Sequence, residues 1–173
     1  LMVSDGIKGI EQAIDKTFGD TPHQKCVVHL SRNLSAYVRA EDKKELAEDI
    51  KKLLSPDFID YKIEQVEQNI VNLADKWRSK YKNLSHYLEK LEYHNYFTYL
   101  QYSVHIRRMI YTTNWIERFN RSARRTLKVR GACPNQESVL ALITSNAIEK
   151  TAKQYAYPIY NFKFEDKLKS KKE

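Results

Sequence analysis

The sequence contains few glycines and prolines, which interrupt helices, and few cysteines, which could form disulfides. Its 173 residues include 4 Gly, 4 Pro and 2 Cys. So little Gly and Pro favours long helices over a turn-rich β architecture. The two cysteines, Cys26 and Cys133, lie far apart in the chain and supply no disulfide framework. A reducing, cytoplasmic setting is therefore expected.

The sequence also lacks the signatures of several common protein classes. No apolar run approaches the roughly 18 to 20 residues that a membrane-spanning helix requires, and no signal peptide is visible. There is no Gly-x-Ser-x-Gly motif and no glycine-rich phosphate-binding loop. We therefore expect no membrane partner, and neither a serine hydrolase of that type nor a P-loop enzyme.

What the chain does have is an excess of cations. Lys and Arg number 30 against 22 Asp and Glu, which gives a net charge of +8 and a pI of about 9.3. The cations gather in residues 118–130 and 163–172, and such clusters fit an anionic partner. With 42% hydrophobic residues, the chain can form one domain with a sizeable core, with room for an inserted lobe.

Hydrophobic periodicity predicts an α/β beginning. Residues 1–4 have the pattern of a short strand, and apolar residues at helical spacing over 7–18 predict a helix. A second strand is predicted over 23–30, followed by a helix that reaches residue 38. Strand, helix, strand and helix in this order are typical of a parallel α/β unit, here residues 1–40.

From residue 41 the pattern becomes entirely helical. Asp42 is a candidate N-cap of one helix, Ser55-Pro56 ends it, and the next helix starts directly afterwards. A third helix is predicted around 83–102. It is rich in Tyr and Phe, whose helical spacing indicates a core more than a base-stacking platform. Residues 41–110 are therefore expected to form an all-α lobe.

The chain is then predicted to return to the core over residues 111–157. A helix over 114–129 is followed by a break that contains Gly and Pro, and by a second helix from 135 to about 155. The remaining residues, 158–173, are expected to form a frayed basic tail.

The helix predicted over 114–129 carries one carboxylate among many cations. At 100° per residue, five cations lie within about 100° of Glu117, namely Arg118, Arg121, Arg124, Arg125 and Lys128. The opposite side is apolar and expected to be buried, with Ile116, Phe119, Ala123 and Leu127. An acid beside a row of cations suits a divalent metal next to a phosphate backbone.

Glu117 also has a purely structural explanation. Asn114 is a good helix N-cap, and a Glu three residues later completes a capping box. Glu117 is also placed to pair with Arg121 one turn along the helix. The helix by itself leaves both interpretations open, a cap and a metal ligand.

Asp5 is a second candidate metal ligand. It lies where the first predicted strand gives way to a turn, and Gly6 lets the backbone bend. Ligands of parallel α/β folds bind at the C-terminal ends of strands, although Ser-Asp-Gly is also an ordinary turn sequence. Two carboxylates, Asp5 and Glu117, that share Mg²⁺ or Mn²⁺ would fit phosphodiester chemistry.

Cys26-x-x-His29 invites a comparison with zinc sites. On the predicted strand, positions 26 and 29 point to opposite faces, so a shared metal is not expected. A structural zinc site needs four ligands, and His23 and Cys133 would join these two only by coincidence. We therefore expect no structural zinc, with Cys26 a small buried side chain and His29 a polar group near the end of the strand.

Four motifs follow one another along the chain: Val3-Ser4-Asp5-Gly6-x-x-Gly9, Cys26-Val27-Val28-His29-x-x-Arg32-Asn33, Thr112-Thr113-Asn114-x-x-Glu117-Arg118-x-Asn120 and Arg130-Gly131-x-x-Pro134. In order and spacing, over nearly the whole chain, they resemble the bacterial Mutator-like insertion-sequence transposases. The resemblance implies an α/β, mostly helical fold, namely the last strands and helices of a ribonuclease-H-like core with an all-α insertion. It also implies a DDE-type site for metal-dependent DNA cleavage and strand transfer.

The resemblance further assigns roles to the motif residues. Asp5 would be the second Asp and Glu117 the Glu of the site, and the two would hold Mg²⁺ or Mn²⁺. Supporting roles in the catalytic core and in DNA handling would fall to Cys26, His29, Asn114 and Asn120. DNA is the implied partner, gripped by Arg118, Arg121, Arg124, Arg125, Lys128 and Arg130. A nucleoid-associated location in bacteria and assembly with itself or with a full-length transposase are further expectations.

The chain departs from the family pattern at its start. The family's first catalytic Asp lies well before the Ser-Asp-Gly segment, and four residues precede Asp5 here. We therefore expect the C-terminal portion of a transposase that neither cuts nor joins DNA by itself. Two other interpretations stay open: a non-catalytic DNA-binding remnant that uses the same basic helix, and a helical protein-interaction module whose basic face is merely solvated.

Overall fold

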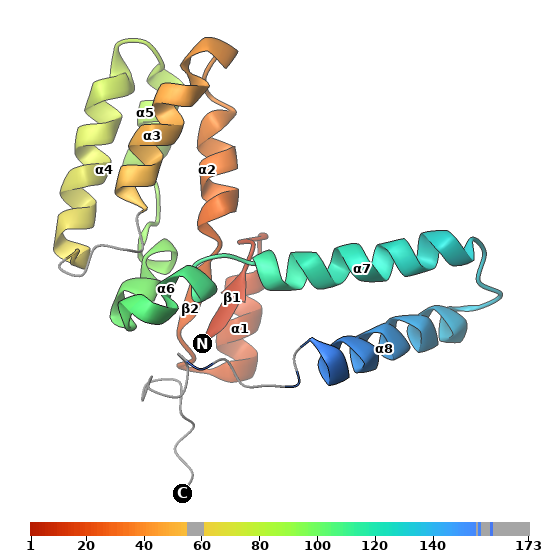
Figure 1. The fold of residues 1–173 in the computed structure, drawn as a ribbon. Coiled ribbons are helices and arrows are strands. Elements are labelled where there is room, and N and C mark those ends of the chain that lie inside the picture. The colour runs from red at the N-terminus through yellow and green to blue at the C-terminus, as the bar shows by residue number, and fades with distance from the viewer. Residues whose placement is uncertain (55–60, 155, 157–159, 161–173) are drawn as a thin grey trace, which may run out of the picture. The chain divides into compact units, whose positions relative to one another are not determined.

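The computed structural model describes residues 1–54, 61–154, 156 and 160. These residues fall into two compact units that divide between Thr112 and Thr113. Each unit is described by itself below. Within the described part the protein is a mostly helical α/β protein with one small sheet (Figure 1).

The first unit begins with the expected strand–helix–strand–helix order. Strand β1 (Met2–Ser4) leads through helix α1 (Ile10–Phe18) to strand β2 (His23–Lys25), and helix α2 (Val27–Ser35) follows. The two strands pair in parallel, with Met2 opposite His23 and Ser4 opposite Lys25. The predicted parallel α/β unit is therefore confirmed in this segment.

The second strand is much shorter than predicted, because it ends at Lys25 rather than at residue 30. The Cys26 N–H still donates to the Ser4 carbonyl at 2.7 Å, and the next N–H, that of Val27, donates to the Tyr111 carbonyl at 3.1 Å. Since β1 offers no further partners, the chain turns at Cys26 into α2. A short buried apolar run does not distinguish strand from helix, which explains the error.

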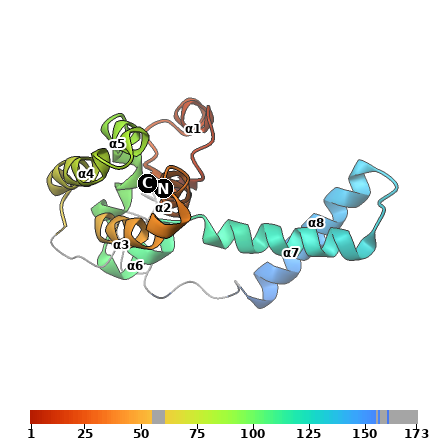
Figure 2. The same ribbon diagram turned by 90° about the horizontal axis from the view of Figure 1, so that it is seen from above.

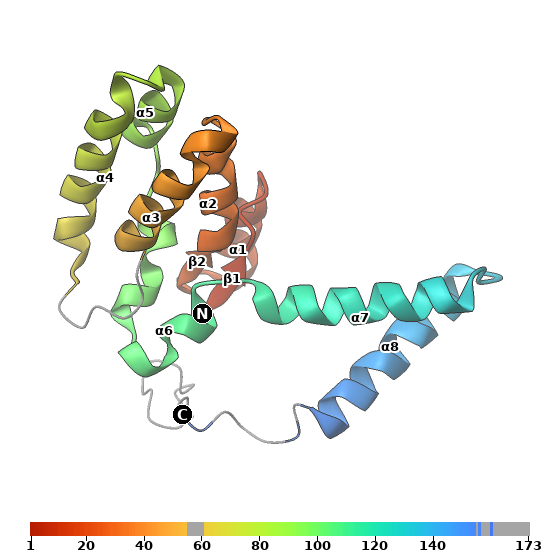
Figure 3. The same cartoon turned by 45° about the horizontal axis from the view of Figure 1, so that its top comes forward.

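The helical lobe contains α3 (Lys43–Leu53), α4 (Ile63–Arg78) and α5 (Lys82–Glu89), preceded by a 3-10 helix, η1 (Ala40–Asp42). Figures 1 and 3 show these three helices lying side by side. Their apolar stripes meet in a core that includes Leu46, Ile50, Val66, Ile70, Leu84 and Leu88. The predicted helix start at residue 57 lies outside the described residues.

Asp42 occupies the N-cap position of α3 as predicted, but its side chain makes no capping hydrogen bond. Its carboxylate instead accepts hydrogen bonds from Lys80 Nζ, at 2.7 Å, and from the Tyr81 hydroxyl. These two bonds lower the pKa of Asp42. Asp42 thus ties the start of α3 to the turn between α4 and α5.

The single helix predicted over 83–102 is wrong. Helix α5 ends at Glu89, and two 3-10 helices, η2 (His94–Tyr96) and η3 (Thr98–Gln101), lead to α6 (Val104–Ile110). The cause is Gln24 of β2, which is fully buried. Its Nε2 donates to the Tyr96 carbonyl at 2.9 Å, and its Oε1 accepts from the Tyr99 N–H at 2.7 Å. Backbone groups that a continuous helix would use are thereby bound to the strand.

The aromatic residues of this segment are mostly core, as predicted. Tyr96, Phe97, Tyr99 and Tyr102 are buried. Burial raises the pKa of Tyr96 to about 12. The Tyr99 hydroxyl donates to the Leu54 carbonyl at 3.2 Å, so even this deeply buried phenol has a partner.

The second unit is a helical hairpin of α7 (Asn114–Arg130) and α8 (Gln136–Lys153). The two helices pack against each other, as Figure 2 shows from above. Gly131 ends α7 with a φ of 79°, a value that favours glycine. Asn135 caps α8, since its Oδ1 accepts from the Ser138 N–H at 2.9 Å. Both predicted helices are confirmed.

Two remaining expectations concern the tail and membranes. The basic tail predicted over 158–173 lies outside the described residues except for Tyr160. In the part of the chain that the structure describes, no helix combines the length and apolar character needed to cross a bilayer.

We predict that Gln24→Ala destabilises the protein by about 2 to 4 kcal/mol, because it empties a buried volume and leaves the Tyr99 N–H without its acceptor. Urea unfolding followed by circular dichroism measures the change. Gln68→Ala on the exposed face of α4, where the amide donates to Asn72 Oδ1, is the matched control. It should stay within about 0.5 kcal/mol of wild type. Equal losses in both variants would contradict the bridging role of Gln24.

Candidate functional site

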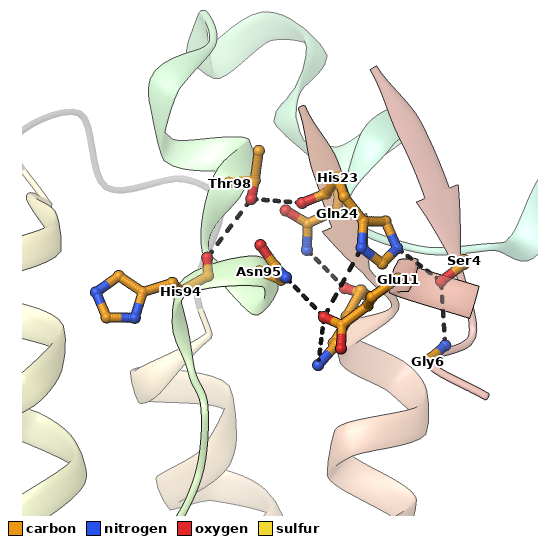
Figure 4. A network of polar contacts seen from close by, with 9 residues as sticks. Ser4, Gly6, Glu11, His23, Gln24, His94, Asn95 and Thr98 are labelled. Atoms are coloured by element: carbon orange, nitrogen blue, oxygen red, sulfur yellow. Dashed lines mark hydrogen bonds and ion pairs between the residues drawn. The ribbon is translucent and has the colours of Figure 1, made fainter. Parts of the chain in front are cut away.

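Asp5 lies in an exposed turn directly after β1. The turn is held by Ser4, whose hydroxyl accepts from the Gly6 N–H at 3.2 Å and lies 2.8 Å from Nε2 of His23 (Figure 4). Gly6 has a φ of 74°, in the left-handed region, so a glycine suits this position. The carboxylate therefore stands at the C-terminal end of a parallel strand, where α/β folds bind ligands.

A polar network of buried and half-buried side chains lies behind this turn (Figure 4). Glu11 on α1 is at its centre: its Oε1 is 2.8 Å from Lys25 Nζ, accepts from Asn95 Nδ2 at 2.7 Å, and is 3.9 Å from His23 Nδ1. The network joins α1, β2 and the 3-10 helix η2. It fixes the end of the sheet from which the Asp5 turn extends.

The network shifts the titration of its own members. Burial lowers the pKa of His23 below its ordinary value of 6.5, although the neighbouring Glu11 carboxylate opposes this. Burial by itself would raise the pKa of Glu11, but the hydrogen bonds from Lys25 and Asn95 prevail and lower it. At neutral pH the site thus contains a neutral imidazole and a charged Glu11–Lys25 pair.

The Cys26-x-x-His29 motif lies on one helical turn and not on a strand. Cys26 is the N-cap of α2 and is fully buried, and His29 is half-buried three residues further on. The prediction that the two side chains point to opposite faces is therefore wrong, because residues three apart on a helix share a face. Since the Cys26 N–H bonds to the Ser4 carbonyl, the motif begins directly beside the Asp5 turn.

Glu117 lies in the first turn of α7 and is half-buried. Its Oε1 accepts from the Thr113 hydroxyl at 3.2 Å, and its N–H donates to the Thr113 carbonyl at 3.0 Å. The helix N-cap is Thr113, with Asn114 as the first helical residue. The predicted capping box between Asn114 and Glu117 is therefore wrong, because the helix begins one residue earlier than that box requires.

The cations of α7 are all exposed, as is Asn120. They follow Glu117 along the helix and comprise Arg118, Arg121, Arg124, Arg125, Lys128 and Arg130. The opposite face is only partly covered in this unit. Ala123 is buried and Phe119 and Leu127 are half-buried, but Ile116 remains 53% exposed, so its predicted burial is wrong. Ile116 lines a pocket of about 350 Å³ with Trp115 and with Lys150 of α8.

The structure brings some of the predicted site residues together. Asp5 and the Cys26–His29 turn lie side by side in the first unit, whereas Glu117, Asn114, Asn120 and the cationic row belong to the second. In the described residues, no group of three or more His, Cys, Asp or Glu side chains is close enough to hold a metal ion. Within its own unit, each of the two candidate acids is placed at the end of a secondary-structure element.

Several site residues were missed by sequence reasoning. Glu11, Lys25 and Asn95 belong to no motif, and Thr113 was not recognised as the partner of Glu117. One signal was present in the sequence: the strand His23-Gln24-Lys25 is entirely polar yet leads directly into the apolar run Cys26-Val27-Val28. A polar strand in the interior requires partners from elsewhere in the chain.

Comparisons with known proteins matched one family and several individual relatives. Residues 1–157 match the family described as "Transposase, Mutator family". The chain is 31% identical over 139 residues to the transposase for insertion sequence element IS905 of Lactococcus lactis, covering 80% of this chain and 34% of that protein. It is 28% identical over 155 residues to the transposase for element IS1201 of Lactobacillus helveticus, covering 86% and 39%.

A third relative is the transposase for insertion sequence element IS256 in transposon Tn4001 of Staphylococcus aureus, 31% identical over 144 residues. The match covers 83% of this chain and 36% of that transposase. The chain thus spans between a third and two fifths of the length of these relatives.

The buried His23 predicts a specific pH dependence of stability. The pKa of His23 is lowered in the folded state. Below about pH 6.5, His23 is therefore protonated in the unfolded chain at pH values where it is still neutral in the folded chain. The free energy of unfolding should therefore fall between pH 7.5 and 5.5, by at most about 1.4 kcal/mol per pH unit. Urea unfolding at several pH values measures this slope.

His23→Gln should flatten the slope in this pH range, because it removes the titrating group while keeping a polar side chain beside Ser4. His105→Gln, a change of an exposed histidine on α6, is the control and should retain the wild-type slope. A slope that persists in His23→Gln would show that another group is responsible. Glu11 acts in the same direction, but only below its ordinary pKa of 4.5.

Proposed function

The chain belongs to the Mutator family of transposases, and on that premise we propose that it carries two catalytic carboxylates and a DNA-binding helix of such an enzyme. The observation that carries the proposal is the arrangement of α7. Glu117 stands in its first turn, held by Thr113, and six exposed cations follow along the same helix. Because the chain spans a minor part of its relatives' length, cleavage and strand transfer are proposed for the whole transposase.

Asp5 and Glu117 are the proposed ligands of a divalent metal, Mg²⁺ or Mn²⁺. Carboxylate oxygens are the donors that these hard cations prefer, and both side chains occur where an ion can reach them, one exposed and one half-exposed. When bound, such an ion stabilises negative charge on the entering and leaving oxygens of a phosphodiester. The protein's own part is to fix Asp5 through Ser4 and Gly6, and Glu117 through Thr113.

The row of cations on α7 is proposed to bind the DNA backbone. Arginine guanidinium groups pair with phosphate oxygens in a forked geometry, and an exposed helix face presents them without rearrangement. Such contacts position a protein on DNA but carry no sequence information. We therefore propose that these side chains bind DNA without regard to sequence and do not recognise the element ends.

The small sheet supports a further, finer proposal about the fold. We infer that residues 1–40 derive from a ribonuclease-H-like core and that residues 41–110 are an all-α insertion into it. The support is the parallel pairing of β1 and β2 across α1, with Asp5 following the first of these strands. Residues 111–157 would then return to that core.

A non-catalytic DNA-binding remnant remains the second candidate function. The exposed cations of α7 favour it as much as they favour an enzyme, because phosphate binding needs neither Asp5 nor Glu117. The two functions differ in whether the acids matter. The first of the following two predictions tests the DNA binding that both functions share, and the second separates them.

Arg121→Ala should weaken binding of the chain to duplex DNA by a similar factor for unrelated sequences. It should also lower the slope of log K against log salt by about 1, since one phosphate contact is lost. Fluorescence anisotropy at several salt concentrations measures both effects. Arg78→Ala is the matched control, because Arg78 of α4 is already paired with Asp75 and Glu89. No duplex binding in wild type would instead favour a protein-interaction module.

Glu117→Gln tests the proposed metal ligand. In a transposase of the relatives' length that carries this sequence, the change should lower strand cleavage and transfer more than about 100-fold, beyond the usual effect of an outer-shell residue. Stability should change little, since Gln can still accept the Thr113 hydroxyl. A gel assay with element-end DNA and Mn²⁺ measures activity, and thermal unfolding measures stability. Activity near that of wild type would show that Glu117 has only a structural role at the start of α7.

A further inference from the structure

The first unit contains a pocket that the proposed function does not use. Its volume is about 510 Å³, within the range of pockets that hold small molecules. Three tyrosines and three basic side chains line most of it, namely Tyr37, Tyr87, Tyr96, Lys25, His86 and Lys90. We call it the tyrosine pocket. The abundance of both rings and cations distinguishes it from an apolar docking groove.

Two of the rings form an open aromatic wall. Tyr37, which follows α2, and Tyr87 of α5 have ring centroids 5.3 Å apart with planes tilted by 41°. Tyr37 is 38% exposed, and Tyr87 is half-buried, so neither ring is simply part of the core. Flat faces of this kind stack nucleobases of any sequence, because every base has a π-face.

Tyr96 of η2 and Lys25 of β2 line another part of the pocket. Tyr96 is buried there, and Lys25 Nζ lies 5.4 Å from the centre of its ring while it pairs with Glu11 at 2.8 Å. Since Glu11 already neutralises Lys25, the positive charge available to a ligand comes from Lys90, which is exposed. Asn83, His86 and Glu92 add groups that can hydrogen-bond to the edge of a base.

The pocket adjoins the turn that holds Asp5. A Cβ atom placed on Gly6 would lie 3.7 Å from Lys25 Cδ and 3.8 Å from the Tyr96 hydroxyl oxygen. Two pocket residues therefore face the space that a side chain at position 6, next to Asp5, would occupy. A nucleotide held in the pocket would belong to the same stretch of strand as a phosphate that reaches Asp5.

We propose that the tyrosine pocket receives one unpaired nucleotide of a DNA strand whose backbone passes Asp5. The base stacks against Tyr37 and Tyr87, and Lys90 binds the adjoining phosphate. A paired base cannot enter without leaving its helical stack, which costs free energy, so the pocket selects nucleotides that are already unpaired. This inference rests on the proposed function in one respect, that the chain binds DNA.

The test uses the full chain and a fluorescent base, 2-aminopurine, whose emission changes when it stacks. Three probes are compared: a duplex with one unpaired 2-aminopurine, the same duplex with that base paired, and the free 2-aminopurine nucleotide. We expect the unpaired duplex to bind about tenfold more tightly than the paired one, with a change in emission, because stacking of one base contributes that much.

Variants locate the effect. Tyr37→Ala should remove most of the tenfold preference, whereas Tyr87→Phe should keep it, since the ring remains. Phe18→Ala is the matched aromatic control, because Phe18 is exposed at the end of α1 and does not line the pocket. Lys90→Ala should weaken the unpaired complex more than Lys82→Ala, an equal loss of charge at the other end of α5. Circular dichroism confirms that each variant is folded.

The possible outcomes distinguish a failure of the pocket assignment from a failure of the proposed DNA binding. Equal binding of both duplexes, or a preference that survives Tyr37→Ala, overturns the pocket assignment and leaves DNA binding intact. A free nucleotide that binds as tightly as the unpaired duplex overturns the assignment to a strand. If no duplex binds, the proposed DNA-binding function fails, and the inference fails with it.

Discussion

The first unit depends on one buried amide. Gln24 lies in the middle of the short strand β2, where a side chain without partners would be costly, and it bonds to backbone groups of Lys25, Tyr96 and Tyr99. These bonds draw the segment after α5 onto the sheet and break it into 3-10 turns. Thr98 adds a second link, because its hydroxyl donates to the His23 carbonyl at 2.7 Å. A sheet of two strands is thereby braced from a part of the chain more than seventy residues away.

The same bracing orders the candidate site. The Asn95 side chain, which belongs to η2, donates a hydrogen bond to Glu11, and Glu11 forms an ion pair with Lys25. His23 contacts the Ser4 hydroxyl, which in turn bonds to the backbone of the Asp5 turn. The acid is therefore exposed, while the groups that position it are buried, as His23 and Lys25 are, or half-buried, as Ser4, Glu11 and Asn95 are. Such an arrangement keeps a carboxylate accessible to a cation or phosphate and fixes its backbone at the same time.

Sequence patterns predicted elements wherever local forces dominate. The amphipathic helices α3 and α7 and the strand–helix–strand beginning were found from periodicity. Helix α8 was found from the break that precedes it, and the Asp5 turn from its Ser-Asp-Gly sequence. Prediction failed where distant residues decide. The stretch 83–102 is helical by pattern but yields to Gln24, and the run after Lys25 becomes a helix because β1 has ended. The tyrosine pocket draws on three separate segments and thus has no local signature.

The three-residue ladder between β1 and β2 has a consequence for how the chain can vary. Successive side chains of a strand face opposite ways, so a shift of one position would turn Gln24 out and put His23 or Lys25 in its place. The position of Gln24 would then hold an ionisable side chain in place of the amide that now satisfies three backbone groups. Lengthening or shortening the connection at residues 19–22 by a single residue is thus penalised as heavily as a change in the core itself, unless α1 compensates for it.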